Sequence, residues 1–290
     1  MQSLYSDIIQ GLWRMDQWGN TAQENLGLIE GALDLGVTTF DQAHVYGWQP
    51  SSEEVMGQAL AQNPLVRNRM KIITKYNICA HGLPEGQVKH YDTSFEAAIQ
   101  SVNLSLARMG VEYIDLLLIH RADFLMNADE VAKAFNKLRF DGKVLSFGVS
   151  NFSPSQYSLL QSRLDFPLVT NQVELNPLRF GCLSDGTLDQ CQEKRVRPMA
   201  WSPLAGGELF TDGERPERVR RALEEVAQEH GVTMDQVAVA WVRRHPSEPH
   251  VIVGTGQLER VRSAVDATKI ELTREQWYRI WTASMGSEVP

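Results

Sequence analysis

Four side chains that together suit the protonation of an oxygen atom stand at or near the ends of apolar segments. Asp41 follows GVTTF, Lys75 follows KIIT and His120 follows LLLI. Tyr46 comes five positions after Asp41, in the stretch FDQAHVYG. Taken singly, each residue has an ordinary structural explanation, since a strand-end acid starts turns and a lysine reaches for water. The hypothesis of a catalytic site therefore depends on whether the four residues converge.

The chemistry that these residue types favour is the protonation of a carbonyl oxygen. A tyrosine has an ordinary pKa of about 10, which is too high for an efficient acid at neutral pH. We expect an ammonium group on Lys75 to lower the pKa of Tyr46 by stabilising its phenolate. Asp41 would keep a half-buried Lys75 charged, and a neutral His120 would hold the reacting oxygen with an N–H. The pattern predicts a carbonyl-polarising pocket with Tyr46 as the general acid.

Short apolar segments, each followed by an amphipathic stretch, organise the chain. The runs LLLI and VIV lack polar alternation, which is typical of strands covered on both faces in a parallel sheet. No GxGxxG follows the first strand, so the fingerprint of the alternative, a doubly wound open sheet, is absent. We therefore predict that residues 1–290 form a single α/β domain, a (β/α)8 TIM barrel, with strands in IIQGLWRM, GVTTFD, MKIITK, YIDLLLIH, KVLSFGVSN, PLVTNQVE, RPMAWS and HVIVGT.

Helical patterns lie between these segments. Residues 93–110 open on a Thr93 cap, with Glu96 three positions on, and close at Gly110. Further helices are expected in three segments, 129–143, 234–245 and, beyond the barrel, 272–286. In a barrel of this kind the active site lies at the carboxyl ends of the strands, where the four candidate residues stand.

Composition and charge exclude several classes of protein. The net charge of −8, the pI near 5.4 and the scattered basic residues disfavour a nucleic-acid surface. The start MQSLYSDIIQGLW does not resemble a signal peptide, and no stretch of about eighteen apolar residues predicts a membrane span. The cysteines and histidines show no metal-ligand spacing, so we expect no metal. We expect a cytoplasmic, monomeric protein that acts on a small carbonyl compound.

The candidate residues also belong to a set of ordered motifs. FDQAHVYG, KIITK, LLLIHRAD, GVSNF, NQVELNP and VIVGTGQLERV together resemble the signature blocks of the aldo-keto reductase family, from about residue 11 to about residue 265. The resemblance implies a (β/α)8 barrel that binds NADP(H) without a Rossmann fold and reduces aldehydes and ketones. It also implies a catalytic tetrad made of Asp41, Tyr46, Lys75 and His120.

The same resemblance assigns four residues to the nicotinamide end of the cofactor. Ser150, Asn151 and Gln172 match the residues that hold the carboxamide. Trp201 stands where the family places an aromatic ring, commonly tyrosine, against the nicotinamide. Judged from the residues alone, Ser150 and Asn151 also suit a helix cap before FSPSQY. The cap and ligand roles are compatible, so both stay open.

Five further residues match the phosphate and adenine positions. Ser202 and Leu204, with the AGG loop after them, resemble the segment that covers the pyrophosphate. Thr255, Gln257 and Arg260 match positions around the adenosine 2′-phosphate and the adenine, at the start of a helix where an anion is favoured. These matches imply NADPH as the cofactor.

Departures from the family pattern bear on specificity. Gln42 replaces the usual threonine of the D-T-A-x-x-Y-G block, and Gly254 and Gly256 replace basic residues that many members carry near the 2′-phosphate. We therefore expect NADPH to be preferred over NADH by a modest factor. The segment after the last strand often lines the substrate pocket, and here it matches no family block, so the substrate is not predicted.

Two other functions fit parts of the sequence. A Schiff-base aldolase would use Lys75 as its nucleophile, but that chemistry needs a neutral lysine and Asp41 favours the charged one. A non-catalytic, NADP(H)-binding regulatory subunit is the second alternative, and an intact tetrad argues against it. Arg121 and Asp123 could reach the rim of the site, but a solvated pair is the expected arrangement, and Glu53 is expected to be a first-turn acid of a helix.

Overall fold

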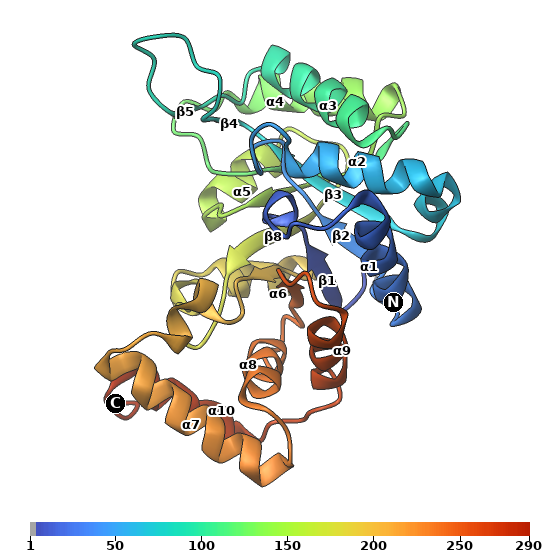
Figure 1. Cartoon of the computed structure of the whole chain (residues 1–290). Helices are drawn as coiled ribbons and strands as arrows, with labels where there is room; N and C mark the ends of the chain where they lie inside the picture. Colours follow the sequence, from blue (N-terminus) through green and yellow to red (C-terminus); the bar gives the residue numbers. More distant parts are fainter. Residues whose placement is uncertain (1–3) are drawn as a thin grey trace.

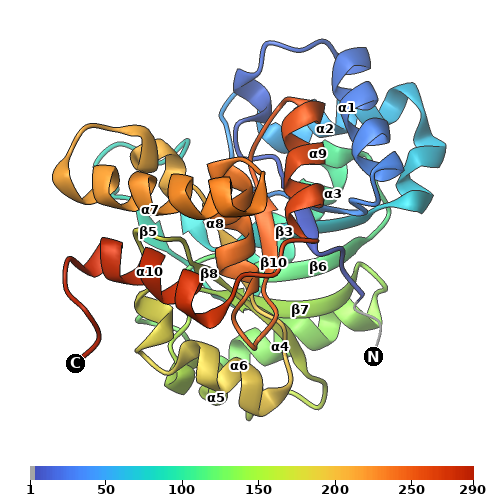
Figure 2. The same ribbon diagram turned by 90° about the horizontal axis from the view of Figure 1, so that it is seen from below.

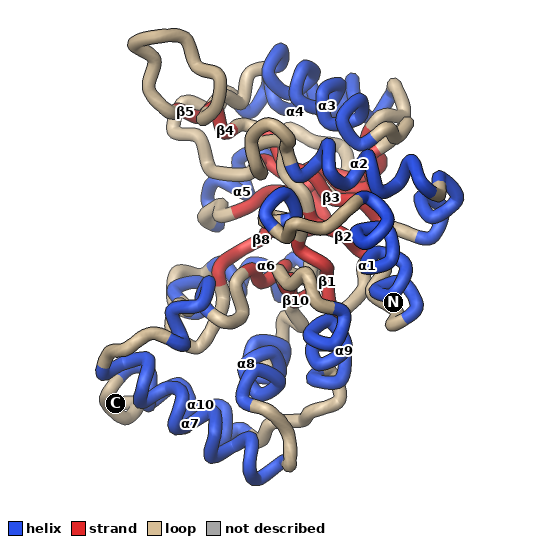
Figure 3. Tube along the Cα trace, in the orientation of Figure 1, coloured by secondary structure: helices blue, strands red, loops and turns tan. Residues whose placement is uncertain are grey.

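Eight parallel strands close into a barrel in this computed structural model, which describes residues 4–290 (Figure 1, Figure 3). The first three residues of the start segment discussed above lie outside the described residues. Each strand pairs with its neighbour around the barrel, and the last pairs with the first. The predicted (β/α)8 architecture is confirmed, with strands at Ile8–Gly11 (β1), Thr39–Asp41 (β2), Lys71–Tyr76 (β3), Ile114–Ile119 (β6), Val144–Ser150 (β7), Leu168–Glu174 (β8), Met199–Trp201 (β9) and His250–Val253 (β10).

Helices surround the barrel in both views (Figure 1, Figure 2). All four segments predicted to be helical form helices, at Phe95–Met109 (α3), Ala128–Phe140 (α4), Met234–Arg243 (α8) and Arg274–Met285 (α10). A short antiparallel hairpin, β4 (Ile78–Cys79) with β5 (His90–Tyr91), follows β3 and was not predicted. The α-helices are α1 (Ala22–Asp34), α2 (Ser52–Gln62), α3 (Phe95–Met109), α4 (Ala128–Phe140), α5 (Pro154–Gln161), α6 (Thr187–Lys194), α7 (Glu214–His230), α8 (Met234–Arg243), α9 (Leu258–Ala267) and α10 (Arg274–Met285).

The start of α3 differs by one residue from the prediction. Ser94, not Thr93, is the N-cap, and its hydroxyl accepts a hydrogen bond from the amide of Ala97 at 3.2 Å. The Thr93 hydroxyl instead donates to Asp123 at 2.8 Å, in the loop after β6. The predicted cap is therefore wrong, because a partner distant in sequence engages the Thr93 side chain. Gly110 ends the helix in the left-handed conformation, as predicted.

Two apolar clusters explain why the strands carry no polar alternation. The residues that fill the barrel interior include Leu116 and Leu118, together with Ile73. The alternate residues Leu117 and Ile119 belong to the larger cluster between the barrel and the helices. Because both faces of each strand are covered, every position of the LLLI run is buried in apolar surroundings.

The helix beyond the barrel, α10, lies alongside α7 (Figure 1, Figure 2). Trp241 of α8 and Trp277 of α10 stack with their ring centroids 4.8 Å apart, and each indole N–H donates to the other residue's carbonyl at 3.0 Å. This reciprocal pair fixes the C-terminal helix to the barrel layer. Among residues 4–290, no helix combines the length and the apolar character needed to cross a membrane.

Candidate active site

Three neighbouring strands bring the candidate catalytic residues to one end of the barrel. Asp41 is the last residue of β2, Lys75 lies one residue before the end of β3, and His120 directly follows β6. The Lys75 ammonium donates to the Asp41 carboxylate at 2.7 Å and to the Tyr46 hydroxyl at 3.1 Å. It also donates to the Gln42 carbonyl at 2.8 Å. The side chains therefore lie together, because the carboxyl ends of parallel strands meet at one mouth.

The Asp41 carboxylate has a partner on each oxygen. Lys75 contacts Oδ2, and the Gln172 side-chain amide donates to Oδ1 at 2.9 Å. Burial works against the charged form of Lys75, but the adjacent carboxylate raises the pKa of the lysine above its ordinary value. Lys75 is therefore an ammonium ion at neutral pH. This charge disfavours the aldolase alternative, which needs a neutral amine.

The pKa of Tyr46 is raised, not lowered as the sequence led us to expect. Desolvation by burial is the largest effect, and the positive charge of Lys75 opposes it without overcoming it. The predicted sign was wrong because the cost of removing a phenolate from water depends on burial, which the sequence does not report. Tyr46 keeps its proton at neutral pH, which is the form that a general acid needs.

His120 faces Tyr46 across the site. The two rings lie edge to face with their centroids 5.6 Å apart. Burial, with added repulsion from Lys75, holds the pKa of His120 well below its usual range, so the imidazole is neutral at neutral pH. Its buried Nδ1 has no hydrogen-bond partner among the described residues. The neutral ring carries one N–H, which can bind an oxygen atom when it is on Nε2.

A histidine that the sequence did not single out fixes the loop bearing Tyr46. His44 Nδ1 lies 2.8 Å from the carbonyl oxygen of Lys75, and Nε2 lies 3.1 Å from that of Ile78. Either neutral tautomer donates to one carbonyl, and the protonated ring donates to both. Arg108 of α3 also donates to the His44 carbonyl at 3.0 Å. These bonds tie the loop to the end of β3 and so hold Tyr46 close to Lys75.

Glu53 is a first-turn acid of α2, as predicted, but its side chain is fully buried. The Thr74 hydroxyl donates to one carboxylate oxygen at 2.7 Å, and Arg108 lies 3.5 Å from the other. Glu54, by contrast, forms an ordinary capping box with Ser51. The buried acid therefore fixes β3 from outside the barrel, one residue before the lysine of the site.

The residues assigned to the nicotinamide end form a hydrogen-bonded chain at the ends of β7, β8 and β9. Ser150 Oγ donates to the Gln172 carbonyl at 2.9 Å, and Asn151 Nδ2 donates to Ser150 Oγ at 2.8 Å. The Trp201 indole N–H then donates to Asn151 Oδ1 at 3.3 Å. The alternative role of residues 150 and 151 as a helix cap is wrong, because Ser153 caps α5.

The backbone after β9 turns sharply where Ser202 and Leu204 lie. Ser202 and Ala205 both have φ of 53°, in the left-handed region that side-chain-bearing residues rarely adopt. The amide of Ala205 donates to the Ser202 carbonyl at 2.8 Å, which closes the turn. Such strain costs on the order of 1–3 kcal/mol per residue and is concentrated at ligand-binding segments. The turn directly follows Trp201.

Thr255, Gln257 and Arg260 lie together at the start of α9. Gln257 is the N-cap residue, and its side chain makes no capping bond to the first turn. Thr255 Oγ1 accepts from the amide of Gln257 at 3.1 Å. The Arg260 side chain is exposed, and within the part of the chain that the structure describes it makes no ion pair. The start of α9 therefore has backbone amides, and the guanidinium of Arg260, that are available to bind a ligand.

The departures from the family pattern have different structural reasons. Gln42 is buried, and its side-chain amide donates to the Ser52 carbonyl at 2.9 Å, so it joins the loop that bears Tyr46 to α2. A Cβ atom at Gly254 would meet no atom within 4 Å. A Cβ atom at Gly256 would lie 2.8 Å from the ring of Trp18. A second basic side chain thus has room at position 254 and none at position 256.

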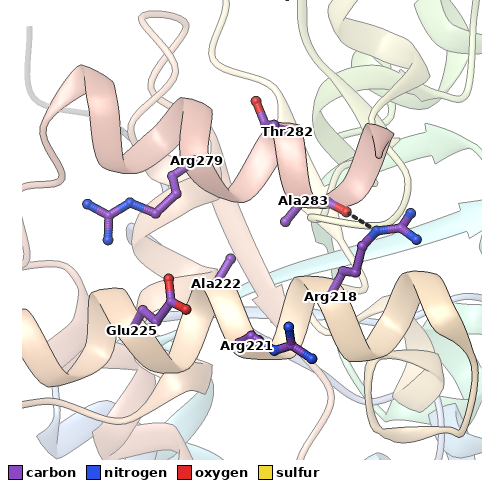
Figure 4. Close-up of a pocket in the computed structure, with 7 residues that line it drawn as sticks. All are labelled: Arg218, Arg221, Ala222, Glu225, Arg279, Thr282 and Ala283. Carbon is purple, nitrogen blue, oxygen red and sulfur yellow. Dashed lines mark hydrogen bonds between the residues drawn. The ribbon is translucent and has the colours of Figure 1, made fainter. Parts of the chain in front are cut away.

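A pocket between α7 and α10 contains none of the candidate residues (Figure 4). Two of its arginines, Arg218 and Arg279, are engaged by the carboxylates of Glu214, Glu229 and Glu275. No group of three acidic, histidine or cysteine side chains within residues 4–290 is arranged to hold a metal. The candidate active site is therefore the barrel mouth. The pocket is lined by Arg218, Arg221, Ala222, Glu225, Arg279, Thr282 and Ala283.

A parallel barrel with a Tyr–Lys–Asp–His cluster at the ends of its strands defines a class of barrel oxidoreductases. The chain belongs to the Aldo/keto reductase family, whose family model matches residues 7–284. Membership supports carbonyl reduction as the general reaction of the protein.

Individual relatives agree with this assignment. The chain is 48% identical to Oxidoreductase YdhF of Escherichia coli (strain K12), over 99% of this chain and 96% of the relative. It is 42% identical to a 6-dehydroglucose reductase of Agrobacterium fabrum, over 98% and 96%. Among solved structures it resembles an aldo/keto reductase from Klebsiella pneumoniae in complex with NADP and acetate. That match has a TM-score of 0.76 and 26% identity, and it covers 95% of this chain and 90% of the other.

Proposed function

We propose that the protein reduces aldehyde or ketone carbonyls to alcohols with NADPH, and that Tyr46 is the general acid. The observation that carries this proposal is the 3.1 Å contact between the Lys75 ammonium and the Tyr46 hydroxyl. Asp41 keeps that lysine charged, and no other hydroxyl group contacts it among the described residues.

In this reaction the residues of the chain transfer one proton to the substrate. Tyr46 donates its hydroxyl proton to the carbonyl oxygen of the substrate. The N–H of neutral His120 holds that oxygen in place. Lys75 stabilises the phenolate that remains, so the contact with the lysine matters most once the proton has left. General acid catalysis of this kind typically contributes ~10²–10⁴-fold to the rate.

The residues at the mouth fit a nicotinamide dinucleotide. Trp201, held by Asn151, offers a ring at the end of β9, and the strained turn after it would cover the pyrophosphate. The start of α9 offers uncapped amides, with Thr255 and Arg260, for the 2′-phosphate. When bound, the reduced nicotinamide supplies the hydride. The NADP in the Klebsiella pneumoniae structure supports the choice of cofactor.

A small, oxygen-rich aldehyde is the substrate class that the relatives favour. Two of them, from Agrobacterium fabrum and Novosphingobium aromaticivorans, are 6-dehydroglucose reductases, at 42% and 37% identity. We propose that this protein acts alone on such a small molecule in the cytoplasm.

The test is direct. The purified protein is mixed with NADPH and a panel of aldehydes and ketones, and the loss of reduced nicotinamide is followed. We expect turnover with at least one small aldehyde and none when the aldehyde is omitted. Tight NADPH binding without turnover of any carbonyl would contradict the proposal and favour a non-catalytic regulatory subunit.

A further inference from the structure

Hydrogen bonds from a neighbouring side chain fix the main chain of Arg121, the residue after His120. The buried Asn77 side chain contacts both polar groups of the Arg121 main chain. Its Nδ2 donates to the Arg121 carbonyl at 2.9 Å, and its Oδ1 accepts from the Arg121 amide at 3.1 Å. Asn77 itself has φ of 91°, a strained value for a residue other than glycine. The two hydrogen bonds to Asn77 thus fix the position of the Arg121 main chain at the barrel mouth.

The Arg121 guanidinium forms no ion pair with any residue that the structure describes. Its Cζ lies 5.6 Å from the centroid of the Trp201 ring. Within residues 4–290 the group makes no hydrogen bond and has no carboxylate oxygen within 4.0 Å. A cation–π contact stabilises by about 0.5–1 kcal/mol at a partly exposed site, which is weak enough for a bound anion to displace. The half-buried guanidinium therefore has donors available for a ligand.

The acids closest to Arg121 along the chain and across the mouth have other partners. Asp123 accepts from Thr93 at 2.8 Å and from the amide of Leu125 at 2.9 Å, so the predicted solvated pair with Arg121 is wrong. Glu174, at the end of β8, lies 3.8 Å from Arg179. Arg121 adds to burial and to Lys75 in favouring the neutral form of His120, and together with Arg179 it favours the ionised form of Glu174.

We propose, on the basis of the proposed reductase function, that Arg121 binds a negatively charged group of the substrate. The preferred substrate would be an aldehyde or ketone with a carboxylate or another oxyanion a few bonds from its carbonyl. A guanidinium suits this role because its planar array of N–H donors pairs with two oxygens at once. Tyr46 would act on the carbonyl while Arg121 holds the opposite end of the molecule.

The first test compares aldehydes of similar size that differ in charge. Succinic semialdehyde, butanal and glyceraldehyde are each turned over with NADPH by the wild type, Arg121→Gln and a control, Arg69→Gln. Arg69 pairs with Asp34 on the exposed surface before β3, away from the site. We expect the wild type and the control to favour the semialdehyde over butanal at least tenfold in kcat/KM. That ratio should fall about tenfold or more in Arg121→Gln, mainly through KM, as the loss of a charge-assisted bond predicts.

Other outcomes separate the two proposals. An unchanged ratio in Arg121→Gln, or a wild-type preference for neutral glyceraldehyde, would overturn the role of Arg121 while the reductase function stands. Absence of any turnover would overturn the reductase function instead. Binding of succinate, followed by tryptophan fluorescence, then decides on Arg121 independently. At least tenfold weaker binding by Arg121→Gln supports the anion site, and equal binding by the two proteins rules it out.

Discussion

Lys75 is 1% exposed and is nevertheless an ammonium ion, because Asp41 compensates its charge. A lone buried charge is very costly, so the lysine and the aspartate depend on each other. The same ammonium contacts the Tyr46 hydroxyl, so in the proposed mechanism the pair supports the proton donor. Removing either partner should therefore damage both the stability and the chemistry of the protein.

The first prediction concerns this pair. Asp41→Asn and Lys75→Met should each lower the free energy of unfolding by about 3–5 kcal/mol, because each leaves one buried group uncompensated. The double variant should lose much less than the sum of the two, in stability and in kcat. Urea unfolding and steady-state kinetics measure the two quantities. Fully additive losses in both would show that the residues do not act as a unit.

The second prediction is the pH dependence of reduction. The raised pKa of Tyr46 keeps the acid protonated up to and beyond its ordinary value of about 10, and the lowered pKa of His120 keeps the imidazole neutral down to below about 6.5. The value of kcat/KM for reduction should thus be level between about pH 7 and pH 9. Alcohol oxidation, which starts from the phenolate, should become faster over the same range. A reduction rate that falls across this range would contradict the raised pKa of Tyr46.

The third prediction concerns Arg260 and cofactor choice. Arg260→Ala should weaken NADPH binding about tenfold or more and leave NADH binding almost unchanged, since a charge-assisted hydrogen bond contributes roughly 1.5–3 kcal/mol. The control is Arg262→Ala, on the same helix, where the guanidinium faces Glu259. Fluorescence titration with both cofactors gives the affinities. Equal loss for NADPH and NADH would show that Arg260 does not read the 2′-phosphate, and tighter NADH binding by the wild type would overturn the cofactor assignment.

At the scale of elements, α2 and α3 approach so closely that a glycine is required between them. A Cβ atom at Gly57 would lie 2.1 Å from the carbonyl oxygen of Arg108. In α1, a Cβ atom at Gly27 would meet no atom within 4 Å. The two helical glycines thus form a matched pair, one half-buried in a helix contact and one exposed to solvent.

The fourth prediction uses this pair. Gly57→Ala should lower the free energy of unfolding by about 1–3 kcal/mol, because the helices must separate to admit the methyl group. Gly27→Ala should raise it by about 0.5–1 kcal/mol, since alanine restricts the unfolded chain and suits a helix. Chemical denaturation of both variants provides the measurement. Shifts in the same direction would show that the close contact of α2 with α3 is not as described.

The elements were predictable where the signal is local and long. The buried strands β3, β6 and β10 follow from apolar runs without polar alternation, and α8 and α10 follow from helical periodicity. The hairpin of β4 and β5 was missed because each strand has only two residues. The cap of α3 was misplaced because the Thr93 hydroxyl bonds to Asp123, a partner that no local pattern reveals.

At the scale of the whole molecule, the barrel is what makes the site predictable. Once eight parallel strands are recognised, the residues at their carboxyl ends must share one mouth, so Asp41, Lys75 and His120 come together from distant segments. The features of the site that could not be predicted depend on burial and on hydrogen bonds between distant parts of the chain. The roles of His44 and Glu53 and the raised pKa of Tyr46 follow from contacts that the barrel creates and that no motif records.

The fifth prediction, Tyr46→Phe, tests the central claim most directly. The variant keeps the ring beside His120 and removes only the hydroxyl that contacts Lys75. We predict that kcat for aldehyde reduction falls ~10²-fold or more, while the NADPH dissociation constant changes by less than about threefold. Tyr278→Phe, on α10, is the control and should keep wild-type activity. If Tyr46→Phe kept more than about a tenth of the wild-type kcat, another residue would have to be the acid.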